Sequence, residues 1–151
     1  MAISGDGRCV AAVEGVSPCL WTRGASGEWS RESIGDAGSL IPRAVNGSGT
    51  VVGLQSTGDG LTHAEIWSRE AGRRRLEKPE GYMRSEALAV NEAGSVVGMV
   101  DGPAGSKVGP NAFIFENGRI RLLDEGGASF AAATAINDKG QVAGVIEERE
   151  P

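Results

Sequence analysis

The side chains of this chain best suited to acid–base chemistry lie around its single histidine. His63 has Asp59 and Glu65 close by, and Asp101 follows in a later polar segment. A histidine can transfer protons near neutral pH, and two carboxylates within about 10 Å of each other can cleave a glycosidic bond. These residues define one hypothesis, a hydrolase or lyase that uses the carboxylates of Asp59, Glu65 and Asp101.

Other motifs that suggest chemistry have simpler structural interpretations. The segment 102–107 is glycine-rich like a phosphate loop, but the glycine and lysine spacing differs and no helical pattern follows it. Three Asp-Gly pairs lack the alternating oxygen ligands of a calcium loop. We find no serine-nucleophile motif. We therefore expect no enzymatic activity, no cofactor and no metal.

These residues belong to a repeating pattern. An apolar run followed by a glycine-containing turn recurs at residues 2–7, 44–49, 89–94 and 135–140. The alanines that begin these segments are 42, 45 and 46 residues apart (44−2, 89−44, 135−89). This period is typical of one small antiparallel sheet per repeat, as in the blades of a β-propeller.

The third repeat shows the expected strands most clearly. Apolar runs at 85–90 and 95–100 flank an Asn-Glu-Ala-Gly turn, and two further runs flank Asn117-Gly118, a strong hairpin signal. We predict an all-β, propeller-like array of four-stranded antiparallel repeats with about three and a half blades. The chain is then a single repeat domain, 1–151, with repeats at approximately 2–43, 44–88 and 89–134 and a partial repeat at 135–151.

The repeat pattern resembles the HAF repeat family of bacterial, often extracellular, proteins. The match is Ala-hydrophobic-Asn-x-x-Gly-x-Val-hydrophobic-Gly, followed by His/Asn-Ala-Phe-hydrophobic-Trp/Phe, and residues 111–115 carry it best. The second repeat keeps His63-Ala64 but has Glu65 in place of phenylalanine, and the first departs at 17–19. The resemblance implies a propeller-like fold, an extracellular or periplasmic location and no catalytic activity. The sequence begins without a signal peptide, so a cytoplasmic location stays open.

Aligning the repeats predicts several core positions. Trp21, Trp67 and Phe115 share one position and are expected to pack between sheets. Cys9 aligns with a buried valine position, and Cys19 with a variable position on the next strand. We expect the two cysteines to face each other across a hairpin, where an oxidising compartment would permit a disulfide. His63 aligns with an asparagine, which favours a structural role.

Charge and hydrophobicity exclude two classes of partner. The net charge is −5 and the isoelectric point is near 4.9, whereas nucleic-acid binding requires clustered Lys and Arg. The basic run at 73–75 is followed by acidic residues and fits a solvated edge strand. No apolar run is long enough to span a membrane. We predict neither nucleic-acid binding nor a membrane span.

Three and a half blades do not close a ring, because propellers need about four to eight. In one explanation, two chains pair through a two-fold axis, and each completes the other's final half-blade to give a seven-bladed homodimer. In the other, the sequence is a truncated fragment of a longer repeat protein. The charged ending at 147–151 favours the self-associating chain.

The preferred function is a non-enzymatic binding or scaffolding module that recognises a protein or glycan. Its longest irregular segments, Gln55 to Thr62 and Asp101 to Pro110, are expected to carry recognition, because loops on a rigid scaffold commonly do so. The expected binding residues are Asp59, His63, Asp101 and Lys107. The carboxylate enzyme and the fragment without independent function are the alternatives.

Overall fold

A computed structural model describes residues 1–102, 109–123 and 128–148, and this part of the chain forms strands, turns and loops without a helix. Four antiparallel sheets follow one another along the sequence. Sheet 1 contains β1 (Ala2–Ile3), β2 (Cys9–Glu14), β3 (Ser17–Arg23) and β4 (Trp29–Ser33). Sheet 2 contains β5 (Ile41–Val45), β6 (Val51–Ser56), β7 (Thr62–Ser68) and β8 (Gly72–Arg75). Sheet 3 contains β9 (Arg84–Val90), β10 (Val96–Asp101), β11 (Asn111–Glu116) and β12 (Arg119–Leu122), and sheet 4 contains β13 (Ala128–Ile136) and β14 (Val142–Glu148).

The all-β class and the antiparallel four-stranded repeat are confirmed. Sheets 2, 3 and 4 begin before the alanines used to count the repeat, because the first strand of each sheet includes the residues that lead into the asparagine turn. Within the described ranges, no helix is long and apolar enough to cross a membrane.

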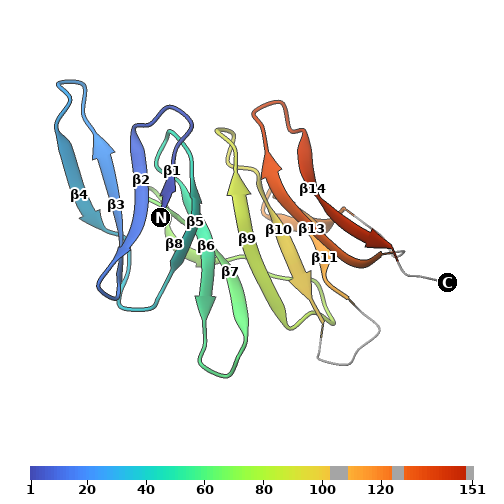
Figure 1. Ribbon diagram of the computed structural model, residues 1–151. Helices are drawn as coiled ribbons and strands as arrows, with labels where there is room; N and C mark the ends of the chain where they lie inside the picture. Colours follow the sequence, from blue (N-terminus) through green and yellow to red (C-terminus); the bar gives the residue numbers. More distant parts are fainter. Residues whose placement is uncertain (103–108, 124–127, 149–151) are drawn as a thin grey trace.

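The core lies between the sheets. The sheets stand face to face in chain order (Figure 1), and three apolar clusters contain residues of successive sheets. Alternate residues of a strand point to opposite faces, so each central sheet contributes to two clusters. On β7, Trp67 packs with sheet 1 and Ile66 packs with sheet 3.

The aromatic position has a different environment in each repeat. Trp21 lies opposite Val10, as Trp67 lies opposite Val51 and Phe115 lies opposite Val96 in their own sheets. Trp67 and Phe115 are buried, as predicted. Trp21 is only half-buried, because it lies on the face of sheet 1 directed away from sheet 2, with the Arg31 guanidinium 5.8 Å from its ring centroid.

The turns between first and second strands join the sheets through a ladder of hydrogen bonds. The Asn46 side-chain amide donates to the backbone oxygen of Asn91 at 2.9 Å, and the Asn91 amide donates to that of Asn137 at 3.1 Å. Glu92 reinforces the ladder: its carboxylate accepts from the Gly47 N–H at 2.6 Å. Its own N–H donates to the carboxylate of Asp138 at 2.9 Å.

A glycine in each of the last three sheets allows a bulge in the neighbouring first strand. A Cβ atom on Gly53, Gly98 or Gly144 would lie 1.9–2.1 Å from a backbone oxygen of that strand. The register of the first strand shifts next to each of these glycines. The backbones of the first and second strands lie so close together here that the second strand requires glycine at this position.

The first turn differs from the others, and this corrects two expectations about the cysteines. Ile3 pairs with Val10, whereas Val45 pairs with Val51, so the first turn has one additional residue and Cys9 corresponds to Thr50 rather than to a valine. A one-residue shift reverses the face of a side chain.

Consequently, the two cysteines do not face each other. Cys9 lies opposite Thr22 and Cys19 lies opposite Ala12, three residues farther along β2 and on the other face. Both thiols are buried and free. The expectation that they face each other across the hairpin, and with it the disulfide between them, is wrong for this structure.

Candidate functional site

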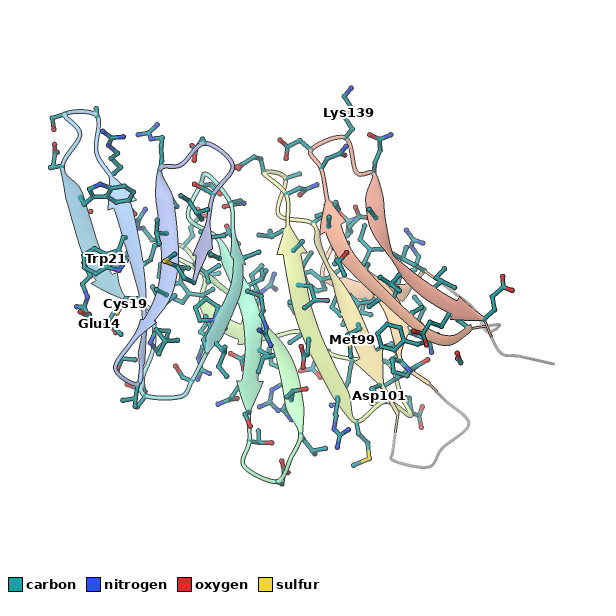
Figure 2. All side chains as sticks on the ribbon, viewed as in Figure 1. Glu14, Cys19, Trp21, Met99, Asp101 and Lys139 are labelled. Atoms are coloured by element: carbon teal, nitrogen blue, oxygen red, sulfur yellow. The ribbon has the colours of Figure 1, made fainter. Side chains whose placement is uncertain are left out.

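The β6–β7 loop and Asp101, with which the second expected recognition segment begins, lie at one end of sheets 2 and 3. The β6–β7 loop and the end of β10 are both found there (Figure 1), and Figure 2 shows Met99 and Asp101 at this end, opposite Lys139 in the β13–β14 turn. Lys107 falls outside the described residues. The site can therefore be built from the β6–β7 loop, β9 and β10.

Asp59 holds the β6–β7 loop in a fixed turn. Its carboxylate accepts hydrogen bonds from the Thr57 hydroxyl at 2.5 Å and the Leu61 N–H at 3.0 Å. These bonds, with that of Thr57 first, lower the pKa of Asp59 below its usual value. Two glycines with positive φ, Gly58 and Gly60, complete the loop. Asp59 is therefore an ionised, exposed residue in a loop whose conformation is fixed by hydrogen bonds.

Arg84, at the start of β9, connects this loop to Asp101. Its Nε donates to the backbone oxygen of Gly60 at 3.1 Å, and its Nη1 lies 3.8 Å from the Asp101 carboxylate. The backbone oxygen of Asp101 also accepts from the Met83 N–H at 2.8 Å. Arg84 thus contacts both the β6–β7 loop and Asp101, the first residue of the second expected recognition segment.

A small hollow of about 180 Å³ lies beside this arginine. Its lining comes from β7, β9 and β10 and contains Thr62, Arg84, Ser85, Glu86, Met99 and Asp101. Arg43 lies 3.7 Å from Glu86, so opposite charges alternate at the rim. Both Arg84, at the start of β9, and Arg43, in the middle of β5, were missed by the sequence reasoning, because no local motif marks an isolated arginine in a strand.

His63 is buried on the face of β7 opposite to that of Thr62, and its Nδ1 has no hydrogen-bond partner among the described residues. Burial, followed by the positive charges of Arg75 and Lys78, lowers the pKa of His63. The equivalent residue of sheet 3, Asn111, instead donates to the Tyr82 hydroxyl at 2.7 Å. The imidazole is therefore a neutral, buried group rather than part of the exposed rim.

Glu65 is separate from the other two carboxylates of the enzyme hypothesis. Its side chain is 4% exposed and lies 3.1 Å from Arg73 Nη1 and 3.9 Å from Arg75 Nε. Burial raises the pKa of Glu65, although the two arginines act against this. On the same strand face as Trp67, it is directed toward sheet 1, whereas Asp101 is paired with Arg84.

The hydrogen bonds and ion pairs of the three carboxylates thus involve different partners. Within residues 1–102, 109–123 and 128–148, no three His, Cys, Asp or Glu side chains are grouped as metal ligands would be. What the site presents is a preformed, charged surface around Arg84.

No protein-family model, curated protein or solved structure matches this chain.

Proposed function

We propose that this chain is a non-enzymatic binding module that recognises its partner through the Arg84 surface, defined as Asp59, Thr62, Arg84, Glu86, Met99 and Asp101. The observation that carries the proposal is the position of Arg84, which holds the β6–β7 loop and Asp101 in one arrangement. A surface fixed before binding loses little conformational entropy when a partner docks.

A protein or a glycan would fit such a surface, and its composition favours a protein. Acidic and basic side chains alternate around the hollow, and Met99 supplies apolar contact area. Complementary charge patterns of this kind give specificity between protein surfaces. The hollow of about 180 Å³ is small compared with the pockets of about 300–1,000 Å³ that hold small molecules.

The hydrolase or lyase alternative has less support. Glycoside cleavage requires two cooperating carboxyl groups, one of them protonated. Asp59 has a lowered pKa and is engaged in its own loop. Glu65 has a raised pKa, which is the direction that the acid needs, but its buried carboxylate is paired with two arginines. For catalysis by these carboxylates, the hydrogen bonds of Asp59 and the ion pairs of Glu65 would have to rearrange.

Binding to displayed protein and glycan libraries, with a parallel assay for turnover of the bound molecules, tests the proposal. We expect saturable binding to a protein without turnover, weakened at least tenfold by Arg84→Glu. Arg119→Glu, on the exposed strand β12, is the matched control and should bind normally. A glycan as the bound molecule would overturn the protein assignment, turnover would favour the enzyme, and equal binding by both variants would place the site elsewhere.

A propeller-like homodimer is a second proposal, supported by the outer face of sheet 1. Ile3 is 64% exposed there and Trp21 is half-buried, whereas the equivalent Val45 and Trp67 are buried against sheet 1. A second copy of the chain could cover this face with a sheet of the same type. Light scattering should then give a solution mass of about twice the 15.5 kDa of one chain. The Trp21→Asp variant should have a solution mass closer to that of one chain. A monomer at every concentration would count against the dimer.

A further inference from the structure

Two hollows lie at the end of the sheets that carries the asparagine turns, opposite the Arg84 surface (Figure 1). Hollow A, of about 510 Å³, belongs to sheet 2 and is lined by Ser48, Thr50, Ser68, Arg69 and Glu70. Hollow B, of about 410 Å³, belongs to sheet 3 and is lined by residues 93–95 and 115–118, together with Arg74 of sheet 2. Both volumes fall within the range of about 300–1,000 Å³ that is typical of small-molecule sites.

The two hollows occupy equivalent positions in successive repeats. Val51 pairs with Trp67 in sheet 2, and Val96 pairs with Phe115 in sheet 3. Counted from these pairs, residues 48, 50, 68, 69 and 70 of hollow A correspond to residues 93, 95, 116, 117 and 118 of hollow B. Every residue that lines hollow A therefore has its counterpart in the lining of hollow B. The hollow is a feature of the repeat rather than of a single loop.

The side chains that line the hollows carry opposite charges that cancel. Among the described residues that line it, each hollow has one arginine and one glutamate: Arg69 and Glu70 in hollow A, Arg74 and Glu116 in hollow B. Hydroxyl and amide groups supply the remaining polar side chains, which are Ser48, Thr50, Ser68, Ser95 and Asn117. Such a lining does not favour a ligand with a net charge. Its many donors and acceptors match a ligand that is rich in hydroxyl groups.

Hydrogen bonds hold the polar groups of hollow A in place. The Arg69 guanidinium donates to the Glu32 carboxylate at 2.8 Å and to the Thr22 hydroxyl at 2.9 Å, both in sheet 1. The Ser68 hydroxyl accepts from the Ala71 N–H at 3.2 Å. Side chains that are fixed before binding lose little conformational entropy when a ligand docks.

Hollow B is held by a comparable set of contacts. The Ser95 hydroxyl donates to the Glu116 carboxylate at 3.1 Å. The Arg74 guanidinium lies 5.5 Å from the centroid of the Phe115 ring, which is buried beneath it. The arginine of hollow B is therefore positioned by an aromatic ring, whereas that of hollow A is positioned by a carboxylate and a hydroxyl.

We propose that hollows A and B are binding sites for neutral carbohydrate, each of which takes part of an oligosaccharide of uncharged sugars. Two equivalent sites suit a ligand with a repeating unit, because linked contacts bind more tightly than either contact alone. The proposal does not depend on the Arg84 surface, which lies at the other end of the sheets, or on the partner of that surface.

An NMR titration of the isotope-labelled chain with four neutral trisaccharides tests the proposal: maltotriose, cellotriose, mannotriose and N-acetylated chitotriose. We expect at least one of them to give saturable shifts of the backbone amides at 48–50, 68–70, 93–95 and 116–118. Amides of the Arg84 surface should change little. Trigalacturonate, an acidic trisaccharide, should bind more weakly than the neutral sugar.

Two alanine variants locate the contacts. Glu70→Ala removes the carboxylate of hollow A, and Glu116→Ala removes that of hollow B; both side chains are exposed. Each variant should weaken binding at its own hollow by about tenfold or more, because a hydrogen bond to a charged group is lost, and should leave the other hollow unchanged. Glu80→Ala, at an exposed position between β8 and β9, is the matched control and should bind as the parent chain does. Circular dichroism checks that all three fold.

Four outcomes would overturn the proposal. The first is the absence of shifts at both hollows with all four neutral sugars, and the second is tighter binding of trigalacturonate. The third is an equal loss of binding in Glu80→Ala and in the two hollow variants. The fourth is a loss of sugar binding in Arg84→Glu, which would assign the sugar to the Arg84 surface instead.

Discussion

Replacing Asn91 with serine should remove one rung of the ladder between sheets 3 and 4 while preserving the turn. The Asn91 Oδ1 accepts from the Ser95 N–H at 2.9 Å, and its amide donates to the Asn137 oxygen at 3.1 Å. The first turn shows that serine can perform the first task, since the Ser4 hydroxyl accepts from the Cys9 N–H at 2.9 Å. Only the bond between sheets is then lost.

The expected cost follows from the partner that remains. The Asn137 oxygen also accepts from the Gly140 N–H at 3.0 Å, so it does not become unpaired. The loss is one net hydrogen bond at a 5% exposed residue together with some packing, which gives a decrease of about 1.5 kcal/mol in the free energy of unfolding. For a chain of this length, that corresponds to a fall in Tm of about 3–6 °C.

Asn137→Ser is the matched control. Asn137 also accepts a turn N–H, from Gln141 at 2.9 Å, but among the described residues its amide donates only to the exposed Gln141 side chain. We expect a loss below about 0.5 kcal/mol. Urea unfolding, followed by circular dichroism and tryptophan fluorescence, measures the free energy of unfolding of both variants. The comparison requires that their m-values be similar. Equal losses in the two variants would refute the assignment of stability to the ladder.

Three further predictions concern the strand interior and the buried titratable groups. Gly98→Ala should reduce stability by about 3 kcal/mol or more, because its Cβ would lie 1.9 Å from the Glu86 oxygen, whereas Gly94→Ala, with open space and a φ of 81°, should cost only about 1–2 kcal/mol in urea unfolding. The lowered pKa of His63 means that the folded state disfavours its protonation, so its contribution to stability is present above pH 6.5 and is lost as the pH falls toward the folded pKa. Unfolding between pH 5 and 7 should show this loss and His63→Asn should abolish it, whereas an unchanged pH slope in the variant would contradict the argument. Both cysteines should react slowly with a thiol reagent in the native chain and rapidly in denaturant, even after mild oxidation, whereas a missing thiol count would indicate the disulfide that the register excludes.

The sequence predicted that much of the candidate site lies in loops, but not which residues contact one another there. Asp59 and Asp101 follow strand patterns at turn-forming positions, so their place at a strand end was predictable. The role of Arg84 was not, because it joins a carbonyl 24 residues earlier to a carboxylate later in the chain. Likewise, the sequence placed Glu65 near Asp59 and His63, but its burial against two arginines depends on how sheets 1 and 2 pack.

The repeat, the all-β class and the asparagine-glycine turns could be predicted from the amino-acid sequence alone. Asparagine bonding to the N–H four residues later and glycine in the left-handed region three residues later, as in Asn91 and Gly94, are interactions within a few residues, so the local pattern is sufficient to predict them. Which hydrogen bonds cross between sheets, and which face each side chain occupies, could be read only from the packing of the sheets. The physical reason is that strand pairing has a period of two residues: one additional residue in the first turn reverses the face of Cys9, and a contact across about 45 residues depends on how whole sheets stack.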